Sequence, residues 1–255
     1  MTGSRAGGAA FSLPVGTVAF LLTDVEGSTL SWEAEPVEMT DAIARHYEVL
    51  DRVVTAHRGV RPQEQGEGDS IVAAFSRASD AVLAAWDAQR ALAIEVWPTS
   101  RPLRVRMAVH AGEAQFRGAL NYAGAAITRT ARLRAIGHGG QVLVSQAARD
   151  LSLDQLGDQV TFVDLGSHRL KDLARPEHVW QLGGEGLSDT FPSLRSLDAV
   201  PNNLPSMSSS FVGRVADVAT VLRLVRSERL VSVTGSGGAG KTRLALAVAD
   251  RKSVV

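Results

Sequence analysis

The pattern of apolar and polar positions divides the chain into alternating strands and helices. Residues 15–23 form a nearly continuous apolar run, which predicts a buried strand. Residues 40–56 carry apolar side chains every three or four positions, which predicts a helix. Two short runs, 60–65 and 71–75, flank a glycine-rich turn that contains Asp69. This spacing predicts a pair of strands with an aspartate in the connecting turn.

Helices and strands continue to alternate over about the next hundred residues. The pattern predicts helices over 78–96 and 123–136, and strands over 103–110, 141–145 and around Phe162 and Val179. The order β-α-β-β-α-β is that of a ferredoxin-like core, here with an added helix and hairpin, so the predicted fold class is α+β. Basic residues alternate with apolar ones at Arg101, Arg104 and Arg106. An exposed strand face is the expected role of these arginines, with a dimer edge or a phosphate contact as alternatives.

A change of composition predicts the domain organisation. Residues 1–14 are mostly small and contain no long apolar run, which predicts a flexible N-terminus, followed by one domain over 15–183. Residues 184–210 are rich in Gly, Ser, Pro and Asn without periodicity, which predicts a linker. A second segment, 211–255, then opens with a predicted helix over 218–225 and a short strand over 230–234.

Composition excludes several classes of protein. The 255 residues include 27 basic and 27 acidic side chains, so no net charge draws the molecule toward nucleic acid or anionic lipid. Cysteine is absent, which excludes disulfides and thiolate metal sites. No apolar run reaches the length of a membrane span, and the N-terminus lacks a signal-peptide core. We therefore expect a soluble cytoplasmic protein that binds neither nucleic acid nor membrane.

The most informative motifs are two acidic turns. Phe-Leu-Leu-Thr-Asp-Val-Glu-Gly-Ser-Thr places Asp24 at the end of the first strand, and Gly-Glu-Gly-Asp-Ser places Asp69 in the turn before residues 71–75. Two carboxylates brought together at strand ends make an all-oxygen site suited to Mg²⁺ or Mn²⁺. Such a site holds a nucleoside triphosphate and activates an oxygen nucleophile. The alternative is two ordinary Asp-containing turns, which are common in loops.

Further motifs downstream give the first half a family resemblance. Arg-Val-Arg-Met-Ala-Val-His-Ala-Gly over 104–112, Asn-Tyr-Ala-Gly-Ala-Ala-Ile-Thr-Arg-Thr-Ala-Arg-Leu over 121–133, and the segments 165–173 and 176–181 occur in that order. Together with the acidic turns, they make residues 15–183 resemble class III nucleotidyl cyclases. Enzymes of this family join the ribose 3′-oxygen of a nucleoside triphosphate to its α-phosphate and release pyrophosphate.

The resemblance implies roles for particular residues. Asp24 and Asp69, with the main-chain carbonyl of Val25, are implied to hold two Mg²⁺ or Mn²⁺ ions. Arg132 is implied to stabilise charge on the α-phosphate, and Lys171 to grip the terminal phosphates. For the last two, the alternative is an ordinary surface arginine on a helix and a surface lysine in a hairpin.

Three positions depart from the usual family pattern. Members that choose ATP usually carry lysine and aspartate where this chain has Gln65 and Asn121. Each amide both donates and accepts hydrogen bonds, so base recognition is expected to be relaxed, with ATP as substrate and GTP as a further candidate. The family's transition-state asparagine falls at Thr128, which offers a single, shorter donor. Loss of one preorganised donor typically costs about 10²–10³ in rate, so we expect a slow enzyme or an inactive one.

The resemblance also implies a homodimer. In the family, the metal-binding aspartates come from one subunit, and the base-reading residues, the arginine and the lysine from the other. This chain carries both sets, so a two-fold dimer builds two equivalent sites.

The second segment carries a different nucleotide motif. Residues 235–242 fit G-x-x-x-x-G-K-[ST], with Gly235, Gly240, Lys241 and Thr242 in the defining positions. The motif predicts a phosphate-binding P-loop, against the alternative of a flexible Gly/Ser turn. The lead-in at residues 211–214 resembles the start of STAND-type regulatory ATPases. Few residues follow Lys241, so we expect a truncated P-loop segment without ATP hydrolysis.

Two functions therefore stand after sequence analysis. The first is a homodimeric adenylate cyclase-like enzyme that uses divalent metal ions. The second is a weak or silent nucleotide-binding or dimerisation module of a signalling or transcription-regulator protein.

Overall fold

The computed structural model describes residues 13–62, 68–118, 120–197, 215–228, 230–236 and 240–252. The chain forms two compact units, Met1–Ser196 and Leu197–Val255. Most of the predicted flexible N-terminus, residues 1–12, and the predicted base-reading residue Gln65 lie outside the described residues.

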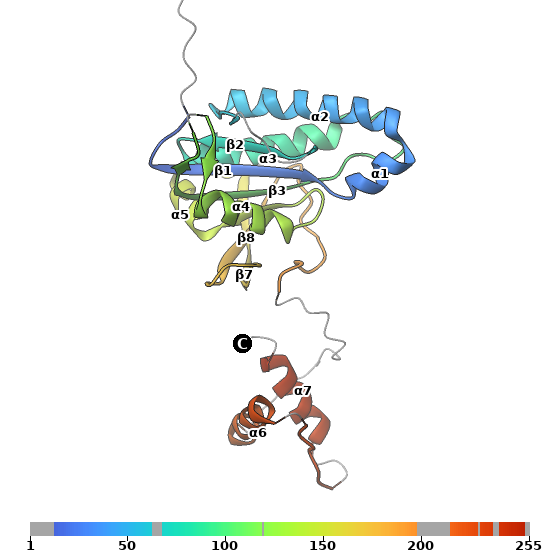
Figure 1. Ribbon diagram of the computed structural model, residues 1–255, viewed down its shortest axis with the longest axis vertical. Helices are drawn as coiled ribbons and strands as arrows, with labels where there is room; N and C mark the ends of the chain where they lie inside the picture. Colours follow the sequence, from blue (N-terminus) through green and yellow to red (C-terminus); the bar gives the residue numbers. More distant parts are fainter. Residues whose placement is uncertain are drawn as a thin grey trace, which may run out of the picture. The chain divides into compact units, whose positions relative to one another are not determined.

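The first unit is built on a six-stranded sheet in the order β2-β1-β3-β6-β8-β7 (Figure 1). The strands are β1 (Thr17–Val25), β2 (Ile71–Phe75), β3 (Val105–Glu113), β6 (Val142–Ser145), β7 (Val160–His168) and β8 (Glu177–Gly184). The pair β3–β6 is parallel and the other pairs are antiparallel. This mixed sheet confirms the predicted α+β class.

Helices cover both faces of this sheet. The helices are α1 (Ser28–Ala34), α2 (Pro36–Ala56), α3 (Ala78–Ile94), α4 (Ala125–Ala135) and α5 (Gln146–Ser152), and a 3₁₀ turn follows at Leu153–Gln155. In Figure 1, α2 and α3 lie on one side of β1 and α4 lies on the other. A short hairpin, β4 (Gln115–Phe116) and β5 (Tyr122–Ala123), leads into α4.

The two faces of β1 explain its long apolar run. Leu21 and Val25 belong to the core beneath α2 and α3, whereas Phe20 and Leu22 pack in a second core with residues of α4. Because side chains alternate along a strand, a strand buried on both faces is apolar at successive positions. The same alternation places Asp24, two residues after Leu22, on the α4 side of the sheet.

Several predicted boundaries differ from the observed ones. The helix predicted from residue 40 begins at Pro36, because proline is well suited to the first helical position. Of the strand predicted over 60–65, residues 60–62 supply only an isolated bridge between Val60 and Ala74, and the rest lies outside the described residues. The short helices α1 and α5 were not predicted, since one or two turns carry too little periodicity to detect.

The linker was predicted to start at residue 184, but residues 184–196 belong to the first unit and pack against the rest of it. Leu194 is buried in a cluster with Ile136, and the main-chain N–H of Arg195 donates to the Ile136 carbonyl at 2.9 Å. The Arg195 guanidinium also pairs with Glu26 at 2.6 Å. A composition rich in Gly, Ser and Pro excludes regular structure but does not exclude packing of single apolar side chains.

The second unit contains two described helices, α6 (Val215–Ser227) and α7 (Lys241–Lys252). Val218, Leu244 and Val248 form their small shared core. The strand predicted over 230–234 is wrong: these described residues have no strand conformation, and Leu230 is 84% exposed. A strand needs a hydrogen-bonded neighbour, and the described part of this unit holds none.

Candidate active site

Asp24 and the turn that carries Asp69 lie side by side at the end of the sheet. Antiparallel pairing of β1 with β2 sets Thr23 opposite Ile71, the first residue of β2. The Ser70 hydroxyl donates to Asp24 Oδ1 at 3.2 Å. Strand register therefore brings together two acidic segments that are far apart in sequence.

Arg106 meets Asp24 from the other neighbouring strand. The two residues are paired in the β1–β3 register, and Arg106 Nε donates to Asp24 Oδ2 at 2.7 Å. The Asp24 side chain is only 15% exposed, so this is a partly desolvated ion pair. The predicted exposed strand face is thus wrong at Arg106, although Arg101 and Arg104 are exposed.

Arg134, which the sequence motifs did not single out, reaches the same place from α4. Its Nη1 donates to the Thr23 carbonyl at 2.9 Å and to the Ser70 hydroxyl at 3.2 Å. Burial lowers the pKa of the Arg134 guanidinium, Asp24 and Asp69 act to raise that pKa, and Arg106 acts to lower it. Both aspartates therefore lie within electrostatic reach of one arginine.

The donor set fits a hard divalent cation. Asp69 Oδ2 is buried and has no hydrogen-bond partner within the described part of the chain, and such an oxygen is costly unless a cation or donor meets it. The described residues hold no group of three or more His, Cys, Asp or Glu side chains that would enclose an ion. Two carboxylates suit Mg²⁺, which commonly takes one or two from the protein and completes its shell with water and substrate phosphate.

The predicted phosphate-binding residues Arg132 and Lys171 lie on α4 and on the connection between β7 and β8. Arg132 donates to Asp172 Oδ2 at 2.7 Å, so α4 and the connection between β7 and β8 meet at this pair. Lys171 is the exposed neighbour of Asp172. Thr128 lies one helical turn before Arg132 and is also exposed. The structure thus brings Arg132 and the Lys171 loop together.

Asn121 directly precedes β5, and its carbonyl accepts from the Arg117 N–H at 2.9 Å. Three residues later, Gly124 caps the N-terminus of α4 with φ of 96°, a backbone conformation that L side chains rarely adopt. The glycine thus fixes the turn by which Asn121 and α4 are joined.

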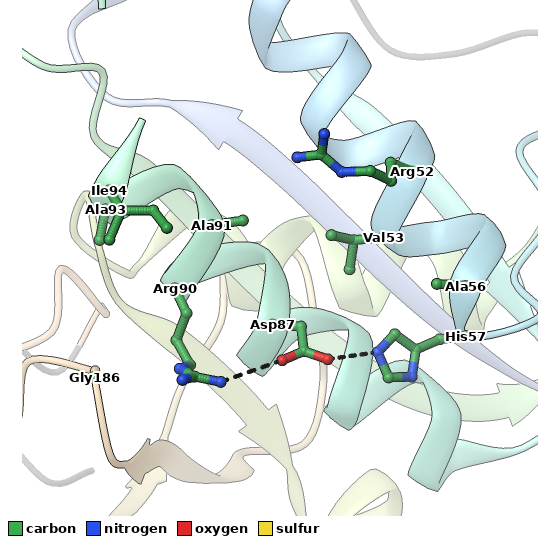
Figure 2. Close-up of a pocket in the computed structure, with 10 residues that line it drawn as sticks. All are labelled: Arg52, Val53, Ala56, His57, Asp87, Arg90, Ala91, Ala93, Ile94 and Gly186. Atoms are coloured by element: carbon green, nitrogen blue, oxygen red, sulfur yellow. Dashed lines mark hydrogen bonds and ion pairs between the residues drawn. The ribbon is translucent and has the colours of Figure 1, made fainter. Parts of the chain in front are cut away.

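A separate hollow of about 540 Å³ lies between α2 and α3 (Figure 2). Asp87 accepts from His57 Nε2 at 2.8 Å and pairs with Arg90 at 3.6 Å on its wall. None of the predicted site residues lines it. The chemistry of the acidic turns is therefore not located in this hollow.

In the second unit, the predicted P-loop lysine folds back on its own loop. Lys241 Nζ donates to the carbonyls of Gly235 at 2.9 Å and Ser236 at 2.7 Å. Gly240 has φ of 75° and immediately precedes α7, where Thr242 is exposed. Residues 237–239 of the motif lie outside the described residues.

Comparison with known proteins identifies the family. The model of the adenylate and guanylate cyclase catalytic domain matches residues 12–183, and the chain belongs to this family. It is 44% identical over 207 residues to the uncharacterized protein Rv0891c of Mycobacterium tuberculosis, covering 81% of this chain and 70% of that protein. It is 26% identical over 229 residues to an adenylate cyclase of Podospora anserina, covering 69% of this chain and 11% of that enzyme.

Solved structures show the same fold. Adenylate cyclases from Trypanosoma brucei, determined in their monomeric state, superpose with a TM-score of 0.64 at 25% identity, covering 73% of this chain and 95% of the solved chain. The fold and family predicted from the sequence are therefore confirmed for the first unit. Among the described residues, no helix is long and apolar enough to span a membrane.

Proposed function

We propose that this protein is a nucleotidyl cyclase that converts ATP to 3′,5′-cyclic AMP and pyrophosphate at a homodimer interface. The observation that carries the proposal is the meeting of Asp24 with the Asp69 turn, where one buried carboxylate oxygen is left without a partner among the described residues. Membership of the cyclase family makes that pair of carboxylates the natural place for catalytic Mg²⁺ or Mn²⁺.

The reaction forms a bond between the ribose 3′-oxygen and the α-phosphorus, and breaks the bond from that phosphorus to pyrophosphate. Two divalent ions, when bound, supply acidification of the 3′-hydroxyl and neutralisation of the triphosphate. Asp24, Asp69 and the Val25 carbonyl would hold these ions. From the partner copy, Arg132 donates to the α-phosphate and Lys171 to the terminal phosphates.

Base selection in this proposal is relaxed, and turnover is slow. Gln65 and Asn121 present amides to the purine, and amides satisfy adenine and guanine edges alike. Thr128 supplies one hydroxyl donor near the reacting phosphate in place of a longer amide. GTP is accordingly a second substrate.

The direct test is an assay of purified protein with Mn²⁺ and ATP or GTP, with cyclic nucleotide detected by mass spectrometry. We expect slow formation of cyclic AMP, abolished in Asp24→Asn and Asp69→Asn, with the fold and dimerisation retained. Asp164→Asn, which changes an exposed carboxylate in β7, is the matched control and keeps wild-type turnover. No product from the wild-type protein with either nucleotide, or full turnover in an aspartate variant, would contradict the assignment.

A second function is favoured by Thr128 itself. If one short donor is insufficient, the first unit acts as a nucleotide-binding and dimerisation module. Binding of ATP with Mn²⁺ by a dimer that releases no cyclic nucleotide distinguishes this function from the first.

For residues 211–255 we propose a P-loop segment that binds phosphate without hydrolysing ATP. Gly235 and Gly240 shape the loop, Lys241 exchanges its loop carbonyls for phosphate oxygens, and Thr242 adds a hydroxyl. The small core between α6 and α7 leaves the loop less rigid than catalysis needs.

A further inference from the structure

Arg134 is held against the acidic turns by fixed acceptors. Arg134 Nη1 donates to the Thr23 carbonyl and to the Ser70 hydroxyl, and the Ser70 hydroxyl in turn donates to Asp24 Oδ1. A main-chain carbonyl in β1 cannot move away without disturbing the sheet. These hydrogen bonds hold the Arg134 guanidinium beside the acidic turns, whereas the guanidinium of a surface arginine is free to point into solvent.

Together with Arg106, Arg134 balances the charge of the two carboxylates. Arg106 pairs directly with Asp24, and Arg134, which donates to Thr23 and Ser70 beside them, interacts electrostatically with both Asp24 and Asp69. Two positive side chains therefore offset the two carboxylates before any ion binds. Charge interactions are strong at a partly buried site because little water screens them. A divalent cation therefore gains less electrostatic binding free energy here than it would at two carboxylates without neighbouring arginines.

We propose that Arg134 is a resident cation that suppresses divalent-ion binding at the Asp24–Asp69 pair until a nucleoside triphosphate supplies compensating negative charge. This inference rests on the proposed function, since it assumes that the aspartates hold metal ions. Arg134 acts here as a positioning and charge-setting residue. It makes the ions and the triphosphate load together, so that the free enzyme stays largely metal-free.

The test measures Mn²⁺ affinity of the full chain without nucleotide, by paramagnetic resonance of free Mn²⁺ or by calorimetry. We expect Arg134→Gln to bind Mn²⁺ at least tenfold more tightly than wild type, because the variant lacks the positive charge beside the carboxylates. A tenfold change in affinity corresponds to about 1.4 kcal/mol. Arg134→Lys keeps the charge and is expected to bind as weakly as wild type. Arg134→Met, measured at low temperature, answers the same question if Arg134→Gln folds poorly.

Arg129→Gln is the matched control, because it removes a positive charge from the same helix at its pair with Glu177. It is expected to leave Mn²⁺ affinity unchanged, whereas Asp69→Asn abolishes Mn²⁺ binding in every background. Thermal melting of each variant verifies that affinities are compared between folded proteins.

Equal Asp69-dependent affinities in wild type and Arg134→Gln would overturn the role of Arg134 and leave the metal centre standing. Tight binding by Arg134→Lys would overturn it too, because the charge would then not be the cause. If no variant binds Mn²⁺ through Asp69, the metal centre itself fails, and the inference fails with it.

Discussion

At the scale of single residues, the site around Asp24 and Asp69 contains some residues that could be predicted from the sequence and others that could not. Asp24 and Asp69 were predictable because each lies in a turn motif beside an apolar strand. Arg106 and Arg134 were not, since their contacts with Asp24 and Ser70 depend on strand register and on how α4 packs. The roles of Thr128, Arg132 and Lys171 stay predictions taken from the family resemblance.

Thr128 gives the sharpest prediction at this scale. We expect Thr128→Asn to raise the turnover number by about tenfold or more, because it restores a longer donor toward the reacting phosphate. Thr128 is exposed on α4, so the larger side chain fits without repacking. Ala125→Asn, at another exposed position of α4, serves as the control. An unchanged or lower turnover in Thr128→Asn would show that the hydroxyl is not what limits the rate.

At the scale of elements, β3 and α2 each bury a neutral histidine. His110 in β3 contacts the Ser145 hydroxyl at 2.8 Å, and burial lowers its pKa to about 4, with Arg129 acting in the same direction. Burial likewise lowers the pKa of His46 in α2 to about 4. An unfolded histidine titrates near 6.5, so protons bind preferentially to the unfolded chain as pH falls from about 6.5 toward 4.

Stability should therefore fall with acidification across that window. Each histidine contributes a loss of about 1 kcal/mol in the free energy of unfolding between pH 6 and pH 5. Denaturant titrations at several pH values measure this slope. His110→Asn, whose amide can still meet Ser145, is expected to make the slope shallower by one histidine's share. A slope that is unchanged in His110→Asn would refute the assignment of a neutral buried histidine.

The same scale shows what periodicity can and cannot predict. The long elements α2, α3 and β1 were predicted because burial imposes a repeating pattern on many residues. The strand predicted over 230–234 failed because an apolar run without a neighbouring strand has no hydrogen-bonding partner. Local pattern specifies which face of an element is apolar, whereas pairing depends on the rest of the chain.

At the scale of the whole molecule, the first unit extends to Ser196, beyond the end of the predicted domain at residue 183. A chain ending after Ser196 should keep its melting temperature and any cyclase activity. A chain ending after residue 183 loses the burial of Leu194 and the Arg195–Glu26 pair. Burial of one leucine is worth about 2 kcal/mol, so we expect melting about 5 °C lower. Equal melting temperatures for the two chains would show that residues 184–196 add nothing.

The central claim is a catalytic site shared between two copies, with Asp24 and Asp69 from one and Arg132 and Lys171 from the other. The most direct measurement mixes Asp69→Asn with Arg132→Ala under conditions that exchange subunits. Each variant alone should be inactive. The equal mixture should recover about a quarter of wild-type activity, since about half of the dimers are mixed and each mixed dimer has one intact site. Activity in either variant alone, or none in a mixture shown to contain mixed dimers, would contradict the account.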